Sequence, residues 1–389
     1  MHRGPVAEIS LSALSHNFET VKTVVRNRPV IAVVKADAYG HGAIEVSKRL
    51  LKEGAAYLAV AFTSEAAVLR NAGISSPIIV LFGRDDIRDF FDLQLIPVIY
   101  SIDTARALSR EANMRKTAIK VHVKIDTGMG RLGLRDREIK TVSEIPGLAI
   151  EGVFSHFSEA DLQDRSFANH QLEKFRKTRT YLEKKLKRRL LSHMANSSAV
   201  LSCEDAYFDA VRPGIVLYGY SAIQPFSENQ DYEGQSKRQR TAKEEVLDPG
   251  FRTLSSALMP VMSVKTKILS LRNLPPGTPI SYGRTFVTKR KSRIGVIPVG
   301  YADGYSRLFS NNAEVLVKGR RVPVVGRVCM DLTMIDVTGV KGVKEGDEVV
   351  IIGVQGKEFI TADELSGKIN AIPYEILTSL GNRSRRIYV

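Results

Sequence analysis

A chain of 389 residues is longer than one ordinary core supports, so its length indicates two domains, one of them large enough to be a barrel. Hydrophobic residues make up 43% of the chain, which is enough to bury a core of enzyme size. The net charge of +15 is spread along the chain, and no zinc finger, RNA-binding aromatic motif or basic zipper accompanies it. We therefore expect no nucleic-acid partner and attribute the charge to solubility and to attraction of anionic ligands.

Two further absences bear on location. No apolar run reaches the length of a membrane span, and residues 1–7 lack the apolar core of a signal peptide. Cys203 and Cys329 have neither the spacing of a disulfide framework nor that of a cysteine metal site. We expect a cytoplasmic protein with reduced thiols, no metal and no membrane partner.

The first predicted element is a helix, because apolar residues recur at helical spacing from Leu11 to Val25 and Ser10 or Ser12 can cap it. Residues 29–34 then form an apolar run rich in β-branched side chains, which predicts a buried strand. Glycines at 40 and 42 interrupt the chain before a helical pattern starts at Ala43.

Lys35 is the unusual residue here, because it is a single lysine at the end of an apolar strand. A poorly solvated ammonium loses its proton more easily, as covalent attachment to a carbonyl cofactor requires. Tyr39 follows shortly after, among glycines that allow a close approach of the backbone. On this stretch alone, a lysine that extends into solvent is the alternative.

Strand and helix patterns then alternate. Strands are predicted over residues 57–62, 77–82, 96–100, 119–125, 148–157, 190–194 and 207–211. Helices are predicted over residues 65–71, 86–93, 103–112 and 172–189, the last with its basic residues on the solvent face. With the strand before Lys35 the strands number eight, which predicts a (β/α)8 barrel, with an open doubly wound sheet as the alternative.

The chemistry of such a barrel lies at the carboxyl ends of its strands. The unusual residues of this chain follow those ends: Lys35, Lys124 and Arg131, His156, Asn196 and Ser197, and the run Arg212-Pro213-Gly214-Ile215. Any one of them is a weak signal, because a histidine at a strand end is more often packed and hydrogen-bonded than catalytic. Five groups at one end of a barrel predict an active site.

Polar composition from Gln224 to Gly250 marks the domain boundary. We expect a barrel domain over residues 1–225, a polar linker over 226–250 and a mainly β domain over 251–389. Strands of the second domain are predicted over residues 261–269, 293–298, 313–317, 322–325, 333–337 and 348–352.

The decapeptide from Val33 to Gly42 resembles the pyridoxal phosphate (PLP) lysine motif of alanine racemases, and the blocks above follow in the order found in that family. The second domain is similar through Ser281-Tyr282-Gly283 and the segments 300–305 and 326–331. The resemblance extends over nearly the full length. It implies a PLP enzyme that interconverts L-alanine and D-alanine and supplies D-alanine for peptidoglycan.

By this resemblance, Lys35 would hold PLP covalently, and Lys35 and Tyr282 would be the two acid/base groups on opposite faces of the substrate. The phosphate would be held by Tyr39, Ser197, Gly214 and Ile215. Arg212 would face the pyridine nitrogen, where many PLP enzymes have a carboxylate. Because a guanidinium keeps its proton, the ring would be a weaker electron sink, which favours quick return of the proton over side reactions.

The resemblance implies further roles. Arg131 would bind the phenolic oxygen of PLP and contact the substrate, His156 would orient Tyr282 and Arg212, and the backbone N–H of Met330 would meet the substrate carboxylate. The entrance would be lined by Asp161, Tyr301, Arg307 and Arg327. Lys124 is carbamylated in some members of the family. Because the second domain covers the partner's barrel in that family, a homodimer with shared active sites is implied.

Two features depart from the family pattern. Many members carry another phosphate-binding tyrosine near the C-terminus, and aligning Tyr374-Glu375 with the family places Asn382 at that position. The polar segment 224–250 is also longer than in compact members.

Three alternatives stay open from the sequence. A racemase of broader specificity, acting on serine or lysine, shares these motifs. Barrel decarboxylases of basic amino acids need an acidic partner for the pyridine nitrogen, where this chain has Arg212. A PLP-carrier protein has a barrel and a lysine but lacks a second domain with Tyr282.

Overall fold

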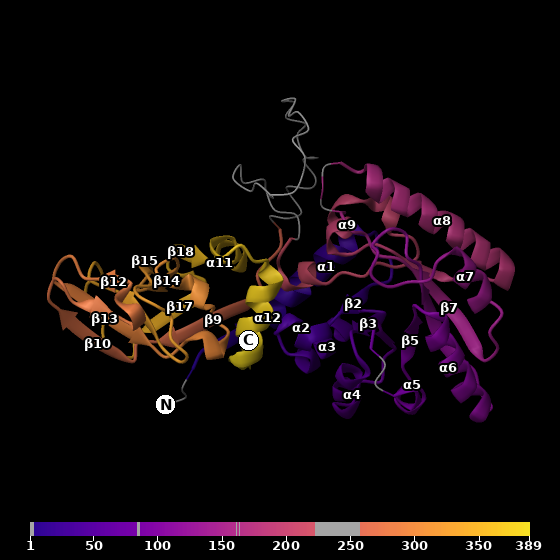
Figure 1. Cartoon of the computed structure of the whole chain (residues 1–389), viewed down its shortest axis with the longest axis horizontal. Coiled ribbons are helices and arrows are strands. Elements are labelled where there is room, and N and C mark those ends of the chain that lie inside the picture. Colours follow the sequence, from indigo (N-terminus) through magenta and orange to yellow (C-terminus); the bar gives the residue numbers. More distant parts are fainter. Residues whose placement is uncertain (1–3, 84–85, 161, 163, 222–256) are drawn as a thin grey trace.

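The computed structural model describes residues 4–83, 86–160, 162, 164–221 and 257–389. It has two bodies, an α/β body and a β-rich body, which meet near α12 (Pro373–Arg383) (Figure 1). The expected fold class, an α/β barrel domain followed by a mainly β domain, is confirmed. The predicted linker 226–250 and the predicted entrance residue Asp161 lie outside the described residues. None of the helices described here is long and apolar enough to cross a bilayer.

The first body is built on seven parallel strands that are neighbours in sequence order. They are β2 (Ile31–Val33), β3 (Tyr57–Val60), β4 (Ile78–Val80), β5 (Ile96–Ile99), β6 (Ile119–Lys124), β7 (Leu148–Phe154) and β8 (Leu191–His193). Helices cover them on the outside: α1 (Leu11–Val24), α3 (Ala43–Lys52), α4 (Thr63–Asn71), α5 (Ile87–Asp92), α6 (Ile102–Met114), α7 (Asp136–Val142), α8 (Ser166–Leu186) and α9 (Ser197–Ser202). Strands covered on both faces need continuous apolar runs, which is why the sequence predicted them well.

The eighth strand predicted over residues 207–211 is wrong as a regular strand. Within the described part of the barrel, the eighth position is filled by isolated bridges, Ala210 to His193 and Val211 to Val30. The backbone N–H of Ala210 donates to Ser192 on one side (3.1 Å), and the carbonyl of Val211 accepts from Ile31 on the other (2.8 Å). A 3-10 turn over 204–206 shortens the segment, and Pro213 has no N–H to extend it. The barrel is nevertheless closed by these bonds.

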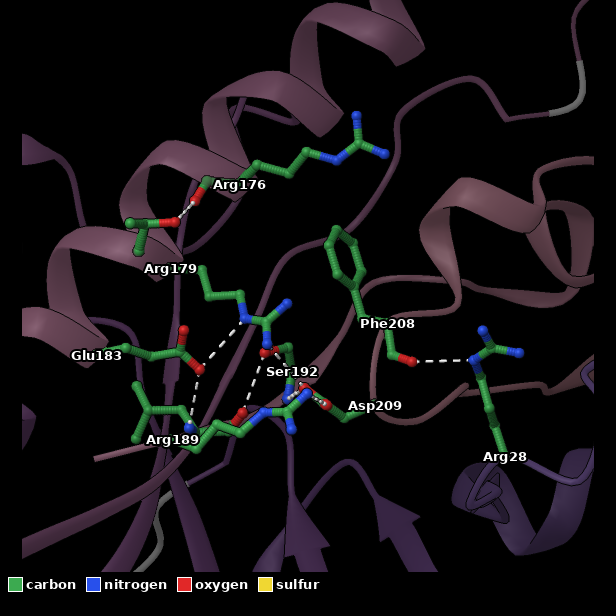
Figure 2. A network of polar contacts seen from close by, with 10 residues as sticks. Arg28, Arg176, Arg179, Glu183, Arg189, Ser192, Phe208 and Asp209 are labelled. Atoms are coloured by element: carbon green, nitrogen blue, oxygen red, sulfur yellow. Dashed lines mark hydrogen bonds and ion pairs between the residues drawn. The ribbon is translucent and has the colours of Figure 1, made fainter.

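A polar network holds this closing segment (Figure 2). Asp209 accepts a hydrogen bond from the backbone N–H of Ser192 (3.0 Å) and pairs with Arg179 (3.4 Å) and Arg189 (3.3 Å). Arg28 donates to the carbonyl of the neighbouring Phe208 at 3.0 Å. Side chains from α8 and from the loop before β8 therefore stabilise a segment that regular strand pairing does not.

The second body contains a seven-stranded sheet with the order β15-β14-β17-β9-β1-β19, in which β18 also pairs with β17. Its strands are β1 (Val6–Ile9), β9 (Met262–Lys267), β14 (Glu314–Val317), β15 (Arg320–Pro323), β17 (Glu348–Gln355), β18 (Glu358–Ile360) and β19 (Arg385–Tyr388). Smaller sheets are formed by β10 (Ser270–Leu274), β13 (Ser292–Ile297) and β16 (Thr333–Asp336), and by β11 (Pro279–Ile280) and β12 (Phe286–Val287).

Both ends of the chain enter this large sheet, because β1 pairs antiparallel with β9 and parallel with β19. Residues 6–9, which the sequence grouped with the barrel, thus contribute to the second body. The six strands predicted for the second domain are confirmed. The sequence did not predict β1, β19 or the helices α11 (Ala362–Lys368) and α12, and α12 packs against residues 35–39 of the barrel.

Candidate active site

A cavity of about 160 Å³ opens at the carboxyl ends of the barrel strands. It brings together seven of the eight residues predicted to bind the cofactor: Lys35, Tyr39, Arg131, His156, Ser197, Arg212 and Gly214. Lys124 and Asn196, which also follow predicted strand ends, line the cavity too, as does Tyr374. The eighth predicted barrel residue, Ile215, is buried directly after Gly214. The structure thus brings these dispersed segments together at one end of the barrel.

Lys35 and Tyr39 are carried by an unusual turn, α2 (Lys35–Tyr39). Ala36, Asp37 and Ala38 have φ and ψ near +50°, and Tyr39 also has a positive φ of 54°, so four consecutive residues other than glycine have left-handed φ angles. Each such L-residue costs roughly 1–2 kcal/mol, so this conformation is not intrinsic to the peptide. It directs the side chains at both ends of the turn, Lys35 and Tyr39, into one cavity.

Side chains from the barrel satisfy the backbone of this turn. His41 Nδ1 lies 3.0 Å from the carbonyls of both Ala38 and Tyr39, and the ring packs on Tyr218 with centroids 4.6 Å apart. Burial lowers the pKa of His41 to about 4, so the ring is neutral and Nδ1 is the donor. Glu65 accepts from the backbone N–H of Ala36 at 2.6 Å.

The cavity has a cationic wall. The amines of Lys35 and Lys124 and the guanidinium of Arg131 lie 5.3–5.9 Å from the ring centre of Phe82. Burial lowers the pKa of Lys35, Arg131 lowers it further, and Glu65 opposes the shift. Burial and Arg131 lower the pKa of Lys124 to about 8. Lys35 is only half-buried, less than the sequence suggested, yet its pKa is lowered, which is the expected direction.

Hydroxyl groups gather at the other end of the cavity. Ser197 Oγ accepts from the backbone N–H of Gly214 at 2.8 Å, and a side chain at Gly214 would come within 2.4 Å of the Tyr39 hydroxyl. Glycine is therefore required there for Tyr39 to reach the loop. The ring of Tyr374 lies 5.7 Å from that of Tyr39. Hydroxyl groups and backbone N–H groups are what a phosphate accepts hydrogen bonds from.

The expectation for Asn382 is wrong. Asn382 is exposed at the end of α12, whereas Tyr374, at the start of the same helix, lines the cavity. Eight residues separate them, which is about 12 Å along a helix. A tyrosine is thus present at the cavity, and the first of the two departures from the family pattern disappears.

Arg212 is held by histidines, of which His193 and His122 are buried and His156 is partly buried. Its guanidinium donates to His193 Nδ1 (2.7 Å), to His156 Nδ1 (3.1 Å) and to the carbonyl of Ser155 (2.9 Å). Because arginine only donates, His193 Nδ1 must accept, and the proton of its neutral ring is on Nε2, which lies 3.0 Å from His122 Nδ1.

Burial, and then Arg212, lower the pKa of all three histidines, that of His122 to about 3. Burial lowers the pKa of Arg212 to about 10, so it stays charged at neutral pH. Sequence reasoning missed His122 and His193, although a histidine inside an otherwise apolar strand is a signal that could have identified them.

The predicted residues of the second domain do not line this cavity. Tyr282 is 72% exposed and Met330 is 54% exposed. They belong to neighbouring loops, because Ser281 Oγ donates to the carbonyl of Arg327 (2.7 Å) and the backbone N–H of Ala302 donates to the carbonyl of Met330 (2.9 Å). Tyr301 and Arg307 lie on the turns that follow. The strand after Tyr282, β12, is at the end of the second body away from the barrel (Figure 1).

Comparison with known proteins gives consistent matches over the whole chain. The family models described as the alanine racemase N-terminal domain and the alanine racemase C-terminal domain match residues 9–222 and 261–388. An alanine racemase of Thermodesulfovibrio yellowstonii is 49% identical over 396 residues, which cover 100% of this chain and 99% of that relative.

Solved structures agree with the sequence matches. The alanine racemase of Bacillus anthracis, solved with bound L-Ala-P, has a TM-score of 0.84 and 33% identity, covering 100% of this chain and 96% of that one. The alanine racemase of Bartonella henselae, solved with covalently bound pyridoxal phosphate, has a TM-score of 0.82 and 28% identity, covering 100% of both chains.

Proposed function

This chain belongs to the alanine racemase family and is an amino-acid racemase, and from that premise we propose that it interconverts L-alanine and D-alanine with PLP, using Lys35 and Tyr282 as two opposed acid/base groups. The observation that carries the proposal is the cavity itself. It combines an amine of lowered pKa, Lys35, with a cationic wall at one end and hydroxyl groups at the other.

The residues present fit PLP. Lys35 would hold it covalently, Arg131 would neutralise its phenolic oxygen, and its phosphate would meet the hydroxyls of Tyr39, Ser197 and Tyr374 with the backbone at Gly214 and Ile215. Arg212 would face the pyridine nitrogen. When bound, PLP withdraws electrons from the amino acid attached to it, which makes the proton on Cα labile.

The chain's own residues would then control the proton. The lowered pKa of Lys35 increases the fraction of free amine, which is the form that can accept a proton. Arg212 keeps its own proton, because its pKa of about 10 is above neutral pH. The two neutral histidines that it contacts, His193 and His156, accept hydrogen bonds from its guanidinium. The position facing the pyridine is therefore cationic and cannot supply a proton, which limits delocalisation of charge into the ring.

We propose that the second acid/base group comes from another molecule of the chain. Tyr282, Met330 and the predicted entrance residues Tyr301, Arg307 and Arg327 are outside the cavity, and Tyr282 is largely exposed. We infer a homodimer in which the second domain of each chain covers the barrel of its partner. Tyr282 would face the substrate from the side opposite Lys35, and the N–H of Met330 would bind the substrate carboxylate.

The proposal includes a cytoplasmic role in supplying D-alanine for peptidoglycan. Two measurements test the proposed cofactor attachment and the proposed reaction. Borohydride reduction followed by peptide mapping is expected to label Lys35, and purified protein is expected to form D-alanine from L-alanine at a rate that Lys35→Ala abolishes. Label on a different lysine contradicts the assignment of Lys35. A faster rate on serine or lysine than on alanine contradicts the proposed substrate.

A further inference from the structure

Asp37 lies within the motif that carries Lys35, and the proposed function gives it no role. We propose that Asp37 and Arg386 form a positioning pair that holds the left-handed turn α2 and thereby sets how Lys35 and Tyr39 enter the cavity. The inference rests on the proposed function and deepens it, since it concerns the same cofactor site. It gives Arg386, on the last strand β19, a role in positioning the residues of that site.

The turn needs such a support because its conformation is unfavourable for its sequence. Ala36, Asp37, Ala38 and Tyr39 are all L-residues with φ between 52° and 54°. Local preference would return them to a right-handed conformation, which would move Lys35 relative to Tyr39. The contacts of Glu65 and His41 hold backbone groups at the start and end of the turn. The middle residue, Asp37, is held from elsewhere.

The carboxylate of Asp37 joins three parts of the chain. Its Oδ1 accepts from the backbone N–H of Ala43 at 2.6 Å, at the start of α3. Its Oδ2 accepts from Arg386 Nη1, and the same nitrogen of Arg386 lies 3.2 Å from the carbonyl of Gly40, which ends the turn. The pair therefore ties the turn to the helix after it and to strand β19 of the second body.

The C-terminal elements also close tightly on the turn. A side chain at Gly42 would lie 1.9 Å from the Tyr388 hydroxyl, and one at Gly40 would lie 2.5 Å from the carbonyl of Leu377. Both glycines have positive φ angles, so both conformation and space require glycine. Figure 1 shows α12 beside α2 where the two bodies meet. The turn thus packs against a surface made by the same chain's own C-terminus.

The pair differs from an ordinary surface ion pair. The side chains of Arg386 and Asp37 are 23% and 40% exposed, and an isolated pair of that kind adds little stability. Here each partner also bonds a backbone group of the turn or of α3. Loss of the pair should therefore change the geometry of the cofactor site more than the stability of the fold.

The test uses Arg386→Met, Asp37→Asn and the double variant. Methionine keeps the aliphatic stem, and asparagine keeps an oxygen for the N–H of Ala43. The dissociation constant for PLP is measured by titrating each apoprotein and following absorption. Each single change is expected to raise the dissociation constant at least about tenfold. The double variant should show no further rise, since both changes remove the same interaction between Asp37 and Arg386. Arg385→Met, on the neighbouring exposed residue of β19, should stay within about twofold.

Circular dichroism of the apoproteins checks the fold. If Arg386→Met unfolds, Arg386→Lys replaces it, and its single amine should restore part of the affinity. The inference is overturned if PLP binds the variants as tightly as the wild type, or if the two single effects multiply in the double variant. A wild-type chain that takes up no PLP at Lys35 overturns the proposed function and the inference together, so the two failures are distinct.

Discussion

Protonation in this protein is set residue by residue, mainly by burial. Burial is the first cause of the lowered pKa of Lys35, of Lys124 and of His41 alike. In a lysine this frees the amine for chemistry, whereas in a histidine it fixes a neutral ring whose two nitrogens have different roles. One physical effect therefore produces reactive groups at the cavity and hydrogen-bonding supports behind it.

His41 should make the protein sensitive to acid. Its pKa is about 4 in the folded chain against 6.5 in a model peptide, so between these values the unfolded chain binds a proton that the folded chain does not. Stability should rise with pH across this window and fall on acidification, by up to about 1.4 kcal/mol per pH unit from this residue.

His41→Asn places an amide donor near the position of Nδ1 and removes the titrating ring. The urea midpoint of this variant should fall less steeply than that of the wild type between pH 6.5 and pH 4.5. His41→Phe, which keeps a ring against Tyr218 but has no donor, should be less stable than His41→Asn at pH 7 by about 1–3 kcal/mol, because two buried carbonyls lose their partner. Equal acid slopes for wild type and His41→Asn would contradict the assignment.

Arg212 should limit side reactions of the bound cofactor. Arg212→Glu places a carboxylate where it could keep the pyridine nitrogen protonated, so racemisation should fall at least about tenfold while pyruvate release from alanine rises. Arg212→Lys keeps a cation but cannot reach all three acceptors, so it should lower racemisation without raising pyruvate. Unchanged pyruvate release from Arg212→Glu would refute the electronic role of Arg212.

At the scale of elements, the sequence predicted what local pattern and two-sided burial determine. Strands β2 to β5 are short apolar runs, and the polar residues that follow the ends of the barrel strands identified most of the cavity residues. The left-handed turn could not be predicted, because Ala36 to Tyr39 have no intrinsic preference for it. It depends on contacts such as that of Asp37 with Arg386, which are 349 residues apart in the chain.

The difference between local pattern and tertiary contact also explains two errors of the sequence analysis. Position in an alignment suggested Asn382, but which face of α12 meets the cavity is a tertiary fact, and it places Tyr374 there. The strand predicted over 207–211 has suitable residues, yet its backbone is held by side chains as much as by neighbouring strands. A segment this short contains too few residues for its apolar pattern to show whether it forms a regular strand.

The closing segment yields a prediction of its own. Asp209→Asn removes the charge that pairs with Arg179 and Arg189 and should lower the free energy of unfolding by about 1–3 kcal/mol, since Asp209 and Arg179 are partly buried. Asp205→Asn, which breaks only the exposed pair with Arg176, should change it by less than about 0.5 kcal/mol. Urea unfolding of both variants makes the comparison, and an equal effect would show that the network does not hold the closing segment.

At the scale of the whole molecule, the residues predicted for the active site lie in two separate places, the barrel cavity and the second body. Lys35 lines the barrel cavity, while Tyr282 is exposed on a distant loop of the second body. If both residues act on one substrate, as we propose, a single chain in this conformation does not bring them together. In a symmetric pair each barrel can meet the other chain's second domain, so two complete sites form from two equivalent contacts.

Mixing inactive variants tests this arrangement. Lys35→Ala and Tyr282→Phe should each be nearly inactive alone. In a mixed dimer one site contains both changes and the other contains neither, so half of its sites should work. Random exchange makes half of the dimers mixed, and activity should therefore recover to about a quarter of the wild-type value.

The control mixes Lys35→Ala with Arg212→Glu. Both changes lie in the barrel cavity, so every site of a mixed dimer carries one of them and no activity should return. Subunit exchange is verified with a mass tag on one chain. Recovery in the first mixture but not in the second requires that Tyr282 serve the partner's Lys35. No recovery in either, with exchange demonstrated, would place Tyr282 in the site of its own chain and would require the second body to move onto its own barrel.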